Sequence, residues 1–256
     1  MTITRRSLVD QVADDIMEQI LSGTLPAGRT LPTEPTLARQ YGVGRNVVHD
    51  AIRLLAARGL VEVKHGRGVF VTTSQRRVVA DTLYLALRRA EATVWDLEEF
   101  ERVLFPAAVS MAIERATPED IKFIRTLAQQ YIEDRRVAIA SGEALMMSSD
   151  TDPTIRAAMA SFGEFLRAVY SATHNEVFVQ FAELLIELRS WREWTQLDPQ
   201  EDLKLDVEFF DVLLAALESR DPHRAEDMLR SPYQHLPGAI ESMKQTPIGD
   251  IVRILP

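Results

Sequence analysis

Residues 42–58 of the chain, GVGRNVVHDAIRLLAAR, contain the pattern that decides the fold of its first part. On a helical wheel of about 100° per residue, the polar and apolar side chains separate onto opposite sides. The polar side consists of Arg45, Asn46, His49, Asp50 and Arg53. The apolar side, which must be buried, consists of Val47, Val48, Ala51, Ile52, Leu54 and Leu55. The stretch therefore predicts a helix from about Gly44 to Arg58 that exposes hydrogen-bonding groups along one side.

Two other helical patterns precede this helix. Ser7 and Asp10 have the spacing of a capping box, and apolar residues then recur at helical spacing until Gly23. Thr33 is the expected N-cap of a second, short helix that ends near Tyr41. We therefore expect three helices before residue 60.

After the third helix the pattern changes to that of β-strands. Residues 60–64 and 69–72 are two short β-branched runs, and the glycine-containing loop 65–68 joins them. Three helices followed by a β-hairpin form a winged helix-turn-helix, which lays its last helix in the major groove of DNA. In such a fold Arg45 is the natural base reader, because its planar guanidinium can donate two hydrogen bonds to a guanine. We expect Asp50, which would repel phosphate, to orient Arg45 or Arg53.

The rest of the chain carries helical patterns and no convincing strand. Several helices are expected to start where proline follows a capping residue, at Pro118, Pro153, Pro199 and Pro222. The expected helices span 78–91, 94–115, 118–141, 153–173, 175–197, 199–219 and 222–244.

The sequence thus predicts a mainly α protein. We expect a winged helix-turn-helix domain at 1–73, a linker at 74–78, an all-α helical bundle at 79–245 and a C-terminal tail at 246–256. The apolar part of the tail, from Ile248, is expected to pack on a helix or on a partner.

Charge is distributed unevenly between the two expected domains. The net charge is −9, yet residues 1–73 contain nine basic and seven acidic residues, and the remainder contains 20 basic and 31 acidic residues. A weakly basic small unit joined to a strongly acidic larger one favours a nucleic-acid-binding domain with a separate control domain.

Composition excludes several other classes. Without cysteine, the chain can form no disulfide, cysteine-ligated metal site or thiol nucleophile. No apolar run approaches the ~18 residues of a membrane span, and the N-terminus lacks the apolar segment of a signal peptide. We therefore expect a soluble, cytoplasmic protein. We also expect no enzyme and no cofactor, because no catalytic constellation is visible and the spacing of Glu98, Glu99 and Glu101 suggests a solvated acidic face.

Several motifs resemble a known family. LPTE at 31–34, GVGR at 42–45, AIRLL at 51–55, GLV at 59–61 and GRGVFV at 66–71 resemble the GntR family of bacterial transcription regulators. The helical remainder, with LE at 97–98, ERATPED at 114–120 and SATHN at 171–175, resembles the all-helical FCD-type effector domain of the FadR-like branch. This resemblance implies a homodimer that binds a palindromic operator in double-stranded DNA and is released or tightened by a small metabolite.

The resemblance places family DNA contacts on Arg45, Asn46, Val47, His49, His65 and Gly66. Together with the wheel and the wing loop, the candidate DNA-binding residues are Thr33, Gly44, Arg45, Asn46, Val47, His49, Arg53, Lys64, His65, Gly66 and Arg67. The loop 65–68 could alternatively be only a tight hairpin turn, and Arg39 is interpreted as a surface charge. Pro35 and His49 stand where family members commonly have arginine, so two permanent charges are lost and binding is expected to depend somewhat on pH through His49.

The effector domain departs further from the family. Many members of the branch bind a divalent metal, but the corresponding positions here are Phe162, Leu166, Phe210 and Pro232, and none of these can ligate a metal. His174, His223 and His235 share no helical spacing of four residues, so no metal site is expected. The arginine that often holds a ligand carboxylate aligns with Glu101, beside Arg102. The candidate effector-pocket residues are Arg102, Phe162, Leu166, Tyr170, Trp191 and Phe210.

Two interpretations of the helical domain remain open. The favoured hypothesis is a metabolite-responsive regulator, acting as a repressor. The alternative is a DNA-binding dimer whose helical domain is filled by its own side chains and needs no ligand, because Phe162, Leu166 and Phe210 are equally suited to a core.

Overall fold

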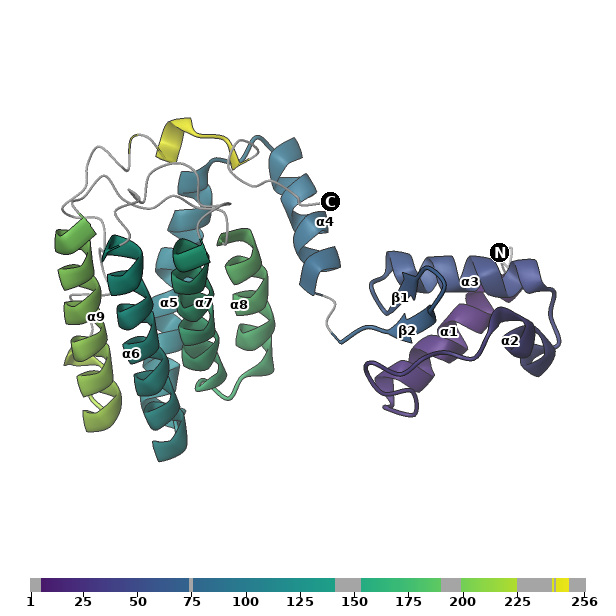
Figure 1. Ribbon diagram of the computed structural model, residues 1–256, viewed down its shortest axis with the longest axis horizontal. Helices are drawn as coiled ribbons and strands as arrows, with labels where there is room; N and C mark the ends of the chain where they lie inside the picture. The colour runs from purple at the N-terminus through teal and green to yellow at the C-terminus, as the bar shows by residue number, and fades with distance from the viewer. Residues whose placement is uncertain are drawn as a thin grey trace, which may run out of the picture. The chain divides into compact units, whose positions relative to one another are not determined.

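The computed structural model describes residues 6–73, 76–140, 153–189, 199–224, 241 and 243–248 (Figure 1). Within these residues the protein is mainly helical, as predicted, and the chain divides into two compact units, residues 1–82 and 83–256. The elements are α1 (Leu8–Leu21), α2 (Glu34–Tyr41), α3 (Arg45–Ala57), β1 (Val61–Lys64), β2 (Gly68–Val71), α4 (Arg76–Arg89), α5 (Val94–Arg115), α6 (Pro118–Ala140), α7 (Pro153–Ser171), α8 (Glu176–Arg189) and α9 (Pro199–Ser219).

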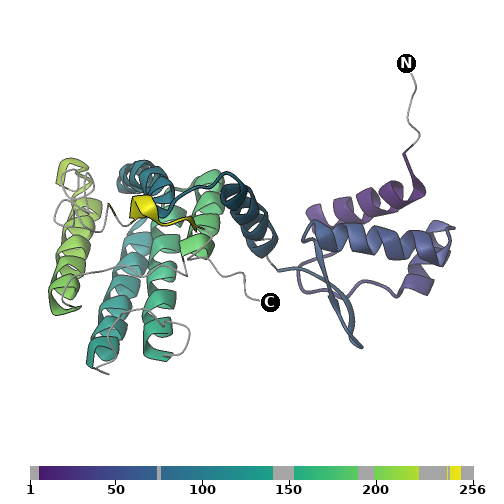
Figure 2. The same ribbon diagram turned by 90° about the horizontal axis from the view of Figure 1, so that it is seen from above.

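The N-terminal unit has the predicted three helices and hairpin (Figure 2). Ser7 caps α1, since its hydroxyl oxygen accepts a hydrogen bond of 3.1 Å from the Asp10 amide. The Asp10 carboxylate bonds the Ser7 hydroxyl at 2.7 Å, so only half of the expected capping box forms. Gly42 ends α2 with φ of 65°, a left-handed conformation that glycine adopts without steric cost. This residue makes the sharp turn from α2 towards α3.

The core of this unit is built on the apolar side of α3. Val48, Ala51, Ile52 and Leu55 are almost fully buried, as the wheel predicts. Burial of an aliphatic side chain of this size contributes about 1.5–3 kcal/mol to folding. The residues packed with them come from α1, α2, the hairpin and the adjoining loops: Val12, Ala13, Ile16, Leu31, Leu37, Ala38, Leu60, Val61 and Val71.

The hairpin is anchored to the loop between α1 and α2. β1 and β2 are antiparallel, with Val61 opposite Val71. In addition, the Leu31 amide donates to the Val69 carbonyl at 2.8 Å, and the Val71 amide donates to the Arg29 carbonyl at 2.8 Å. This pairing of the loop with β2 was not expected from the sequence, and it fixes the wing to the helices.

The C-terminal unit is a bundle of helices. α6 packs against both α7 and α9, while α7 also packs against α5 and α8. Figure 1 shows α9, α6, α7 and α8 side by side in that order. α6, α7 and α9 begin at Pro118, Pro153 and Pro199, as the proline rule predicts. The end of the expected helix 175–197 and most of the helix 222–244 lie outside the described residues.

The chain returns to this bundle near its C-terminus. The Ile248 amide donates to the Ala92 carbonyl at 2.9 Å, and the Val94 amide donates to the Thr246 carbonyl at 3.0 Å. The Ile248 side chain is 2% exposed and lies in a cluster that contains Tyr84, Leu97, Leu185 and Leu188. The first residue of the expected apolar tail therefore packs on helices of its own chain.

One expectation about this unit is wrong. Glu98 and Glu101 do not form a solvated acidic face, because their exposed fractions are only 1% and 7%. Both lie on the side of α5 that contains the buried Val94, Leu97 and Ala108. The sequence argument judged these residues by their charge, whereas their helical position directs them into the bundle.

Candidate nucleic-acid interface

The polar side of α3 forms the centre of the candidate interface. Arg45, Asn46, His49 and Arg53 are all exposed, and their polar groups project from the side of α3 that faces away from the core. Arg45 is the first residue of the helix, directly after Gly44, which is its N-cap. The predicted contact residues are exposed except for Val47, which is half-buried at the edge of the core.

The basic side chains that the structure describes in this unit fall into two groups. Arg6 and Arg58 lie 3.0 and 3.8 Å from carboxylate oxygens of Asp14, and Lys64 lies 3.2 Å from Glu62. By contrast, a second group forms no ion pair with any residue in the described part of the chain: Arg29, Arg39, Arg45, Arg53 and Arg67. These uncompensated charges are available to an anion without loss of an existing ion pair.

Asp50 does not have the predicted role. It is exposed on α3, and within the described ranges it forms no ion pair with Arg45 or Arg53. Arg45 lies five residues away, a spacing at which helical side chains do not face one another. Asp50 therefore leaves a free negative charge beside the candidate DNA contacts.

His49 has a partner that the sequence did not reveal. Its Nδ1 lies 2.9 Å from Oε1 of Glu34, the first residue of α2. The pair links α2 to α3 and fixes the orientation of the imidazole. When the imidazole is protonated, Glu34 also offsets part of its charge, so His49 supplies less positive charge to DNA than an arginine would.

The wing presents its tip to solvent. His65, Gly66 and Arg67 are exposed, and the Arg67 amide closes the turn by donating to the Lys64 carbonyl at 2.9 Å. Gly66 has φ of 71°, which the turn requires. The Lys64 ammonium lies 5.5 Å from the centre of the Phe70 ring in addition to its contact with Glu62. Of the wing cations, Arg67 is thus the more available.

Thr33 occupies the expected N-cap position of α2, but its hydroxyl makes a different bond. The Thr33 Oγ1 lies 2.9 Å from the Thr36 Oγ1, and no side-chain bond to a helix amide forms. The exposed hydroxyl remains close to the start of α2. It can therefore contribute to an interface.

An open cleft of about 530 Å³ lies beside the first turn of α3. It is lined by Pro35, Ala38 and Arg39 of α2, by Val43 of the turn and by Arg45. The Arg39 Nε donates a hydrogen bond of 3.4 Å to the carbonyl of Pro35. Arg39 is exposed, as expected of a surface charge, but its place in a cleft with Arg45 could not be predicted, because spacing within one helix does not show that two helices share a cleft.

A tyrosine holds the helix-turn-helix together. The Tyr41 hydroxyl donates to Oδ2 of Asp15 on α1 at 2.6 Å. Burial of the hydroxyl and this hydrogen bond to a negative acceptor raise the pKa of Tyr41 to about 12. This bond ties the end of α2, where the turn towards α3 begins, to α1.

In the C-terminal unit, three of the positions that the family resemblance assigns to metal ligands lie in the bundle core, where Phe162 and Phe210 supply aromatic rings and Leu166 an aliphatic side chain. The ring centres of Phe165 and Phe210 are 4.6 Å apart, and that of Tyr131 lies 5.1 Å from Phe162 and 5.6 Å from Phe210. The fourth position, Pro232, lies outside the described residues. Carbon atoms thus replace ligand atoms, and in the described part of the chain no group of three potential ligands could hold a metal. These residues do not fit a metal.

The other candidate effector residues differ in burial and location. Leu166 and Tyr170 are buried, and the Tyr170 ring centre lies 6.1 Å from that of Phe105 in the same bundle. Arg102 is half-buried and its guanidinium lies 5.6 Å from the centre of the Trp95 ring. Trp191 lies outside the described residues. Phe162, Phe210 and Tyr170 therefore lie among the packed rings of the bundle. Arg102 lies instead against the Trp95 ring.

A buried polar group next to these rings was missed by the sequence analysis. Arg135 is 4% exposed, and its Nε lies 3.4 Å from Oδ2 of Asp206. The Tyr131 hydroxyl donates to the same oxygen at 3.0 Å. The signal was present, since Arg135 continues the buried side of α6 one turn after Tyr131.

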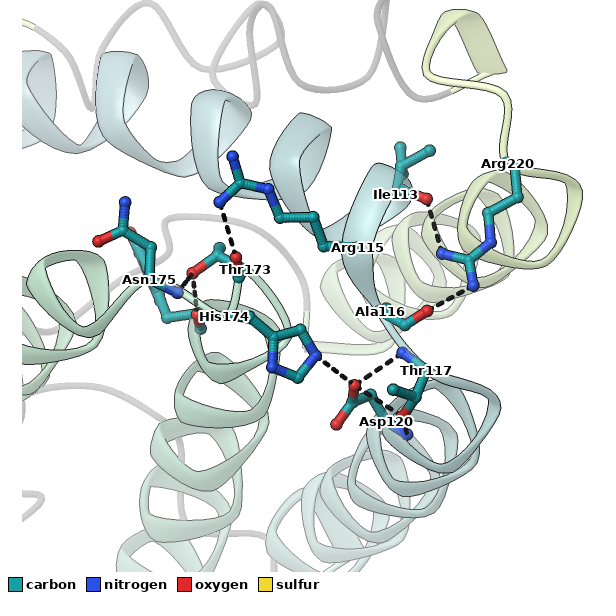
Figure 3. A network of polar contacts seen from close by, with 10 residues as sticks. Ile113, Arg115, Ala116, Thr117, Asp120, Thr173, His174, Asn175 and Arg220 are labelled. Carbon is teal, nitrogen blue, oxygen red and sulfur yellow. Dashed lines mark hydrogen bonds and ion pairs between the residues drawn. The ribbon is translucent and has the colours of Figure 1, made fainter.

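A second polar network joins the ends of helices in the bundle (Figure 3). Asp120 accepts bonds from the amide and hydroxyl of Thr117 at 2.7 and 2.8 Å, and His174 Nε2 lies 3.0 Å from the same oxygen. Burial raises the pKa of Asp120, but the bonds from Thr117 and His174 outweigh burial and lower it below 3.8. Arg115 donates to the Thr173 carbonyl at 3.1 Å, so the network holds the α5–α6 and α7–α8 junctions together.

Comparison with known proteins agrees with this geometry. The family described as "Bacterial regulatory proteins, gntR family" matches residues 8–71, and the FCD domain family matches residues 96–235. The chain belongs to the GntR family. It is a helix-turn-helix transcription regulator of the FadR-like branch with an FCD domain, and this family is one of regulators rather than enzymes.

Individual relatives are distant. The chain is 36% identical over 121 residues to the HTH-type transcriptional regulator Mce2R of Mycobacterium tuberculosis, a match that covers 46% of this chain and 50% of that protein. It is 28% identical over 243 residues to the Exu regulon transcriptional regulator of Escherichia coli, covering 92% and 84%. It is 25% identical over 182 residues to the galactonate operon transcriptional repressor of Escherichia coli, covering 64% and 76%.

The fold is also found in a solved structure. A GntR protein of Streptococcus agalactiae matches with a TM-score of 0.59 at 20% identity, covering 93% of this chain and all of that one. At this identity the likeness concerns the fold alone. In the described part of the chain, no helix has the length and apolar character that crossing a bilayer requires.

Proposed function

We propose that this GntR-family regulator is a homodimeric repressor that binds a palindromic operator and responds to a small metabolite bound in its FCD domain. The observation that carries the DNA-binding part is the exposed side of α3, where Arg45 and Arg53 form no ion pair with any described residue. The name of the galactonate operon repressor supports repression as the mode of control. A protein that binds operator DNA would act in the cytoplasm.

The proposed contacts follow from the order of residues along α3. The first turn of a recognition helix lies nearest the base edges, so Arg45 reads a base, and Arg53, more than two turns further on, binds a phosphate. Arg67 and the glycine amides of the wing reach a phosphate or the minor groove. In a dimer, the two recognition helices must lie about 34 Å or a multiple of it apart to occupy both half-sites.

The test is selection of binding sites from a random duplex library with the full-length protein. The expected result is an inverted repeat, bound by a protein of dimeric mass in light scattering, with an affinity that falls steeply as salt rises. If the protein shows no salt-dependent affinity for any duplex, the proposed DNA-binding function is wrong.

The effector part of the proposal is supported by the buried Arg135 group. Arg135 is buried beside Asp206 and Tyr131, and an arginine suits a carboxylate because it can donate two parallel bonds. Arg135 and Tyr131 border the aromatic rings of Phe162 and Phe210. We therefore propose a small organic anion as the effector, with Arg135 as its candidate anchor.

The packed rings favour the second interpretation, a filled FCD domain without a ligand. Phe165 is fully buried, and its ring contacts those of Phe162, Phe209 and Phe210. A thermal-shift screen of sugar acids and other carboxylates separates the two. Stabilisation of the wild type that is lost in Arg135→Met supports an effector, whereas no shift with any compound, and operator binding that no compound changes, supports the filled domain.

A further inference from the structure

The cleft between α2 and the first turn of α3 brings two guanidinium groups to one place. Arg39 and Arg45 both line it, together with the apolar or weakly polar surfaces of Pro35, Ala38 and Val43. Two like charges that share a cleft repel one another unless an anion lies between or beside them. Within the part of the chain that the structure describes, neither arginine has a carboxylate partner.

The position of Arg39 is set by its own helix. Arg39 follows Pro35 by four residues, so the two lie on the same side of α2. The Nε of Arg39 donates to the Pro35 carbonyl at 3.4 Å, which steadies the side chain and leaves the two terminal nitrogens of the guanidinium for another acceptor. Pro35 itself carries no charge and cannot bind an anion with its side chain.

The cleft adjoins the end of α3 that is proposed to enter the major groove. A duplex that contacts Arg45 must place a phosphate backbone along the rim of that groove, and phosphates receive half to two-thirds of the hydrogen bonds between proteins and DNA. An exposed arginine in the second turn of α2 is suited to such a phosphate because its fork can donate twice.

We propose that Arg39 binds a backbone phosphate of the DNA in the cleft beside Arg45. It thereby supplies, one turn further along α2, a positive charge that Pro35 cannot provide. This inference rests on the proposed DNA-binding function and adds a residue to it. Because a phosphate contact carries no sequence information, Arg39 strengthens binding to all duplexes alike and fixes the register of α3 in the groove.

The test measures binding of the full-length protein to two fluorescent duplexes, one of mixed sequence and one carrying the selected operator. Titrations at several salt concentrations between 50 and 200 mM give the slope of log affinity against log salt. Loss of one phosphate contact per protomer removes two contacts from the proposed dimer and lowers the steepness of that slope by about 1.8, so the ratio of wild-type to Arg39→Ala affinity should narrow by about twelvefold over this range. At low salt, Arg39→Ala should bind both duplexes more weakly than the wild type, and the loss of affinity should be the same on each.

Arg58→Ala is the matched control. It also removes a guanidinium group, but from the far end of α3, about 20 Å from Arg45 along the helix. Arg58 lies there 3.8 Å from Asp14. Its salt slope should equal that of the wild type. Arg39→Lys keeps the charge and should retain the slope, and Pro35→Arg combined with Arg39→Ala should restore it.

The outcomes separate this inference from the proposed function. A wild-type protein without salt-dependent DNA binding overturns the proposed function. A wild-type protein that binds steeply, with an Arg39→Ala variant of the same slope and affinity, overturns only the role of Arg39. An effect of Arg39→Ala on the operator alone would assign Arg39 to a base and overturn the phosphate contact. Unchanged melting temperatures show that the variants remain folded, as expected for an exposed side chain.

Discussion

Replacing Arg45 by alanine tests the recognition helix most directly. Arg45 is exposed at the first position of α3, and the core contacts of this helix come from Val48, Ala51 and Ile52. The substitution therefore removes only groups that face solvent. We expect the free energy of unfolding to change by no more than about 0.5 kcal/mol.

The expected effect on DNA binding is larger. A bidentate arginine–guanine pair contributes about 1–3 kcal/mol of discrimination, which corresponds to about a 5- to 150-fold change in the affinity of each half-site. In the described part of the chain Arg45 has no ion pair to give up on binding, so breaking an internal contact does not reduce this figure.

The assay compares the selected operator with duplexes in which one base pair of each half-site is changed. The wild type should discriminate at every contacted position, and Arg45→Ala should lose discrimination at one. Arg53→Ala, the control on the same face, should weaken all duplexes to the same extent. An Arg45→Ala protein with the full wild-type pattern of base preference would refute the assignment of Arg45 to a base.

Four further outcomes are expected. Asp50→Asn should tighten binding to any duplex several-fold at low salt, because it removes an uncompensated negative charge from the DNA-facing side of α3; weaker binding in anisotropy would contradict this. Tyr41→Phe should lower the free energy of unfolding by about 1 kcal/mol in denaturant titrations; since the pKa is raised to about 12, this contribution is fully present below pH 10 and is lost as the pH rises through the raised value. Asp120→Asn should lower the melting temperature above pH 3.8, and the difference from the wild type should vanish as the pH falls through the lowered pKa of Asp120; a constant difference would show that the charge is unimportant. Phe165→Ala should cost about 3–5 kcal/mol, because a fully buried ring is lost, and a smaller loss in urea titrations would indicate a loosely packed bundle.

The sequence predicted the helices and strands of the described residues well because their signals are local. The period of 3.6 residues in α3, the change to alternating strands after Gly59 and the proline starts of α6, α7 and α9 each depend on neighbours along one element. Burial of Val48, Ile52 and Leu55 follows from the same wheel that exposes Arg45. Such patterns can be recognised without knowing which other elements pack against them.

Features that depend on two elements were not predicted. The contact of His49 with Glu34 and that of Tyr41 with Asp15 each join different helices, so their spacing in the chain is uninformative. The shared cleft of Arg39 and Arg45 is of the same kind. Glu98 was mispredicted for a different reason. Its charge suggested exposure to solvent, although the helical period places it on the buried side of α5.

The seating of Ile248 has a practical consequence. Because this side chain fills the junction of α4, α5 and α8 from the far end of the chain, a shortened protein that stops before Thr246 would leave Leu97 and Leu188 in contact with water. Expression tags are therefore better fused to the N-terminus. Protease cleavage between Thr246 and Ile248 would likewise report whether this segment is packed on the bundle, since the backbone there is hydrogen-bonded to Ala92 and Val94.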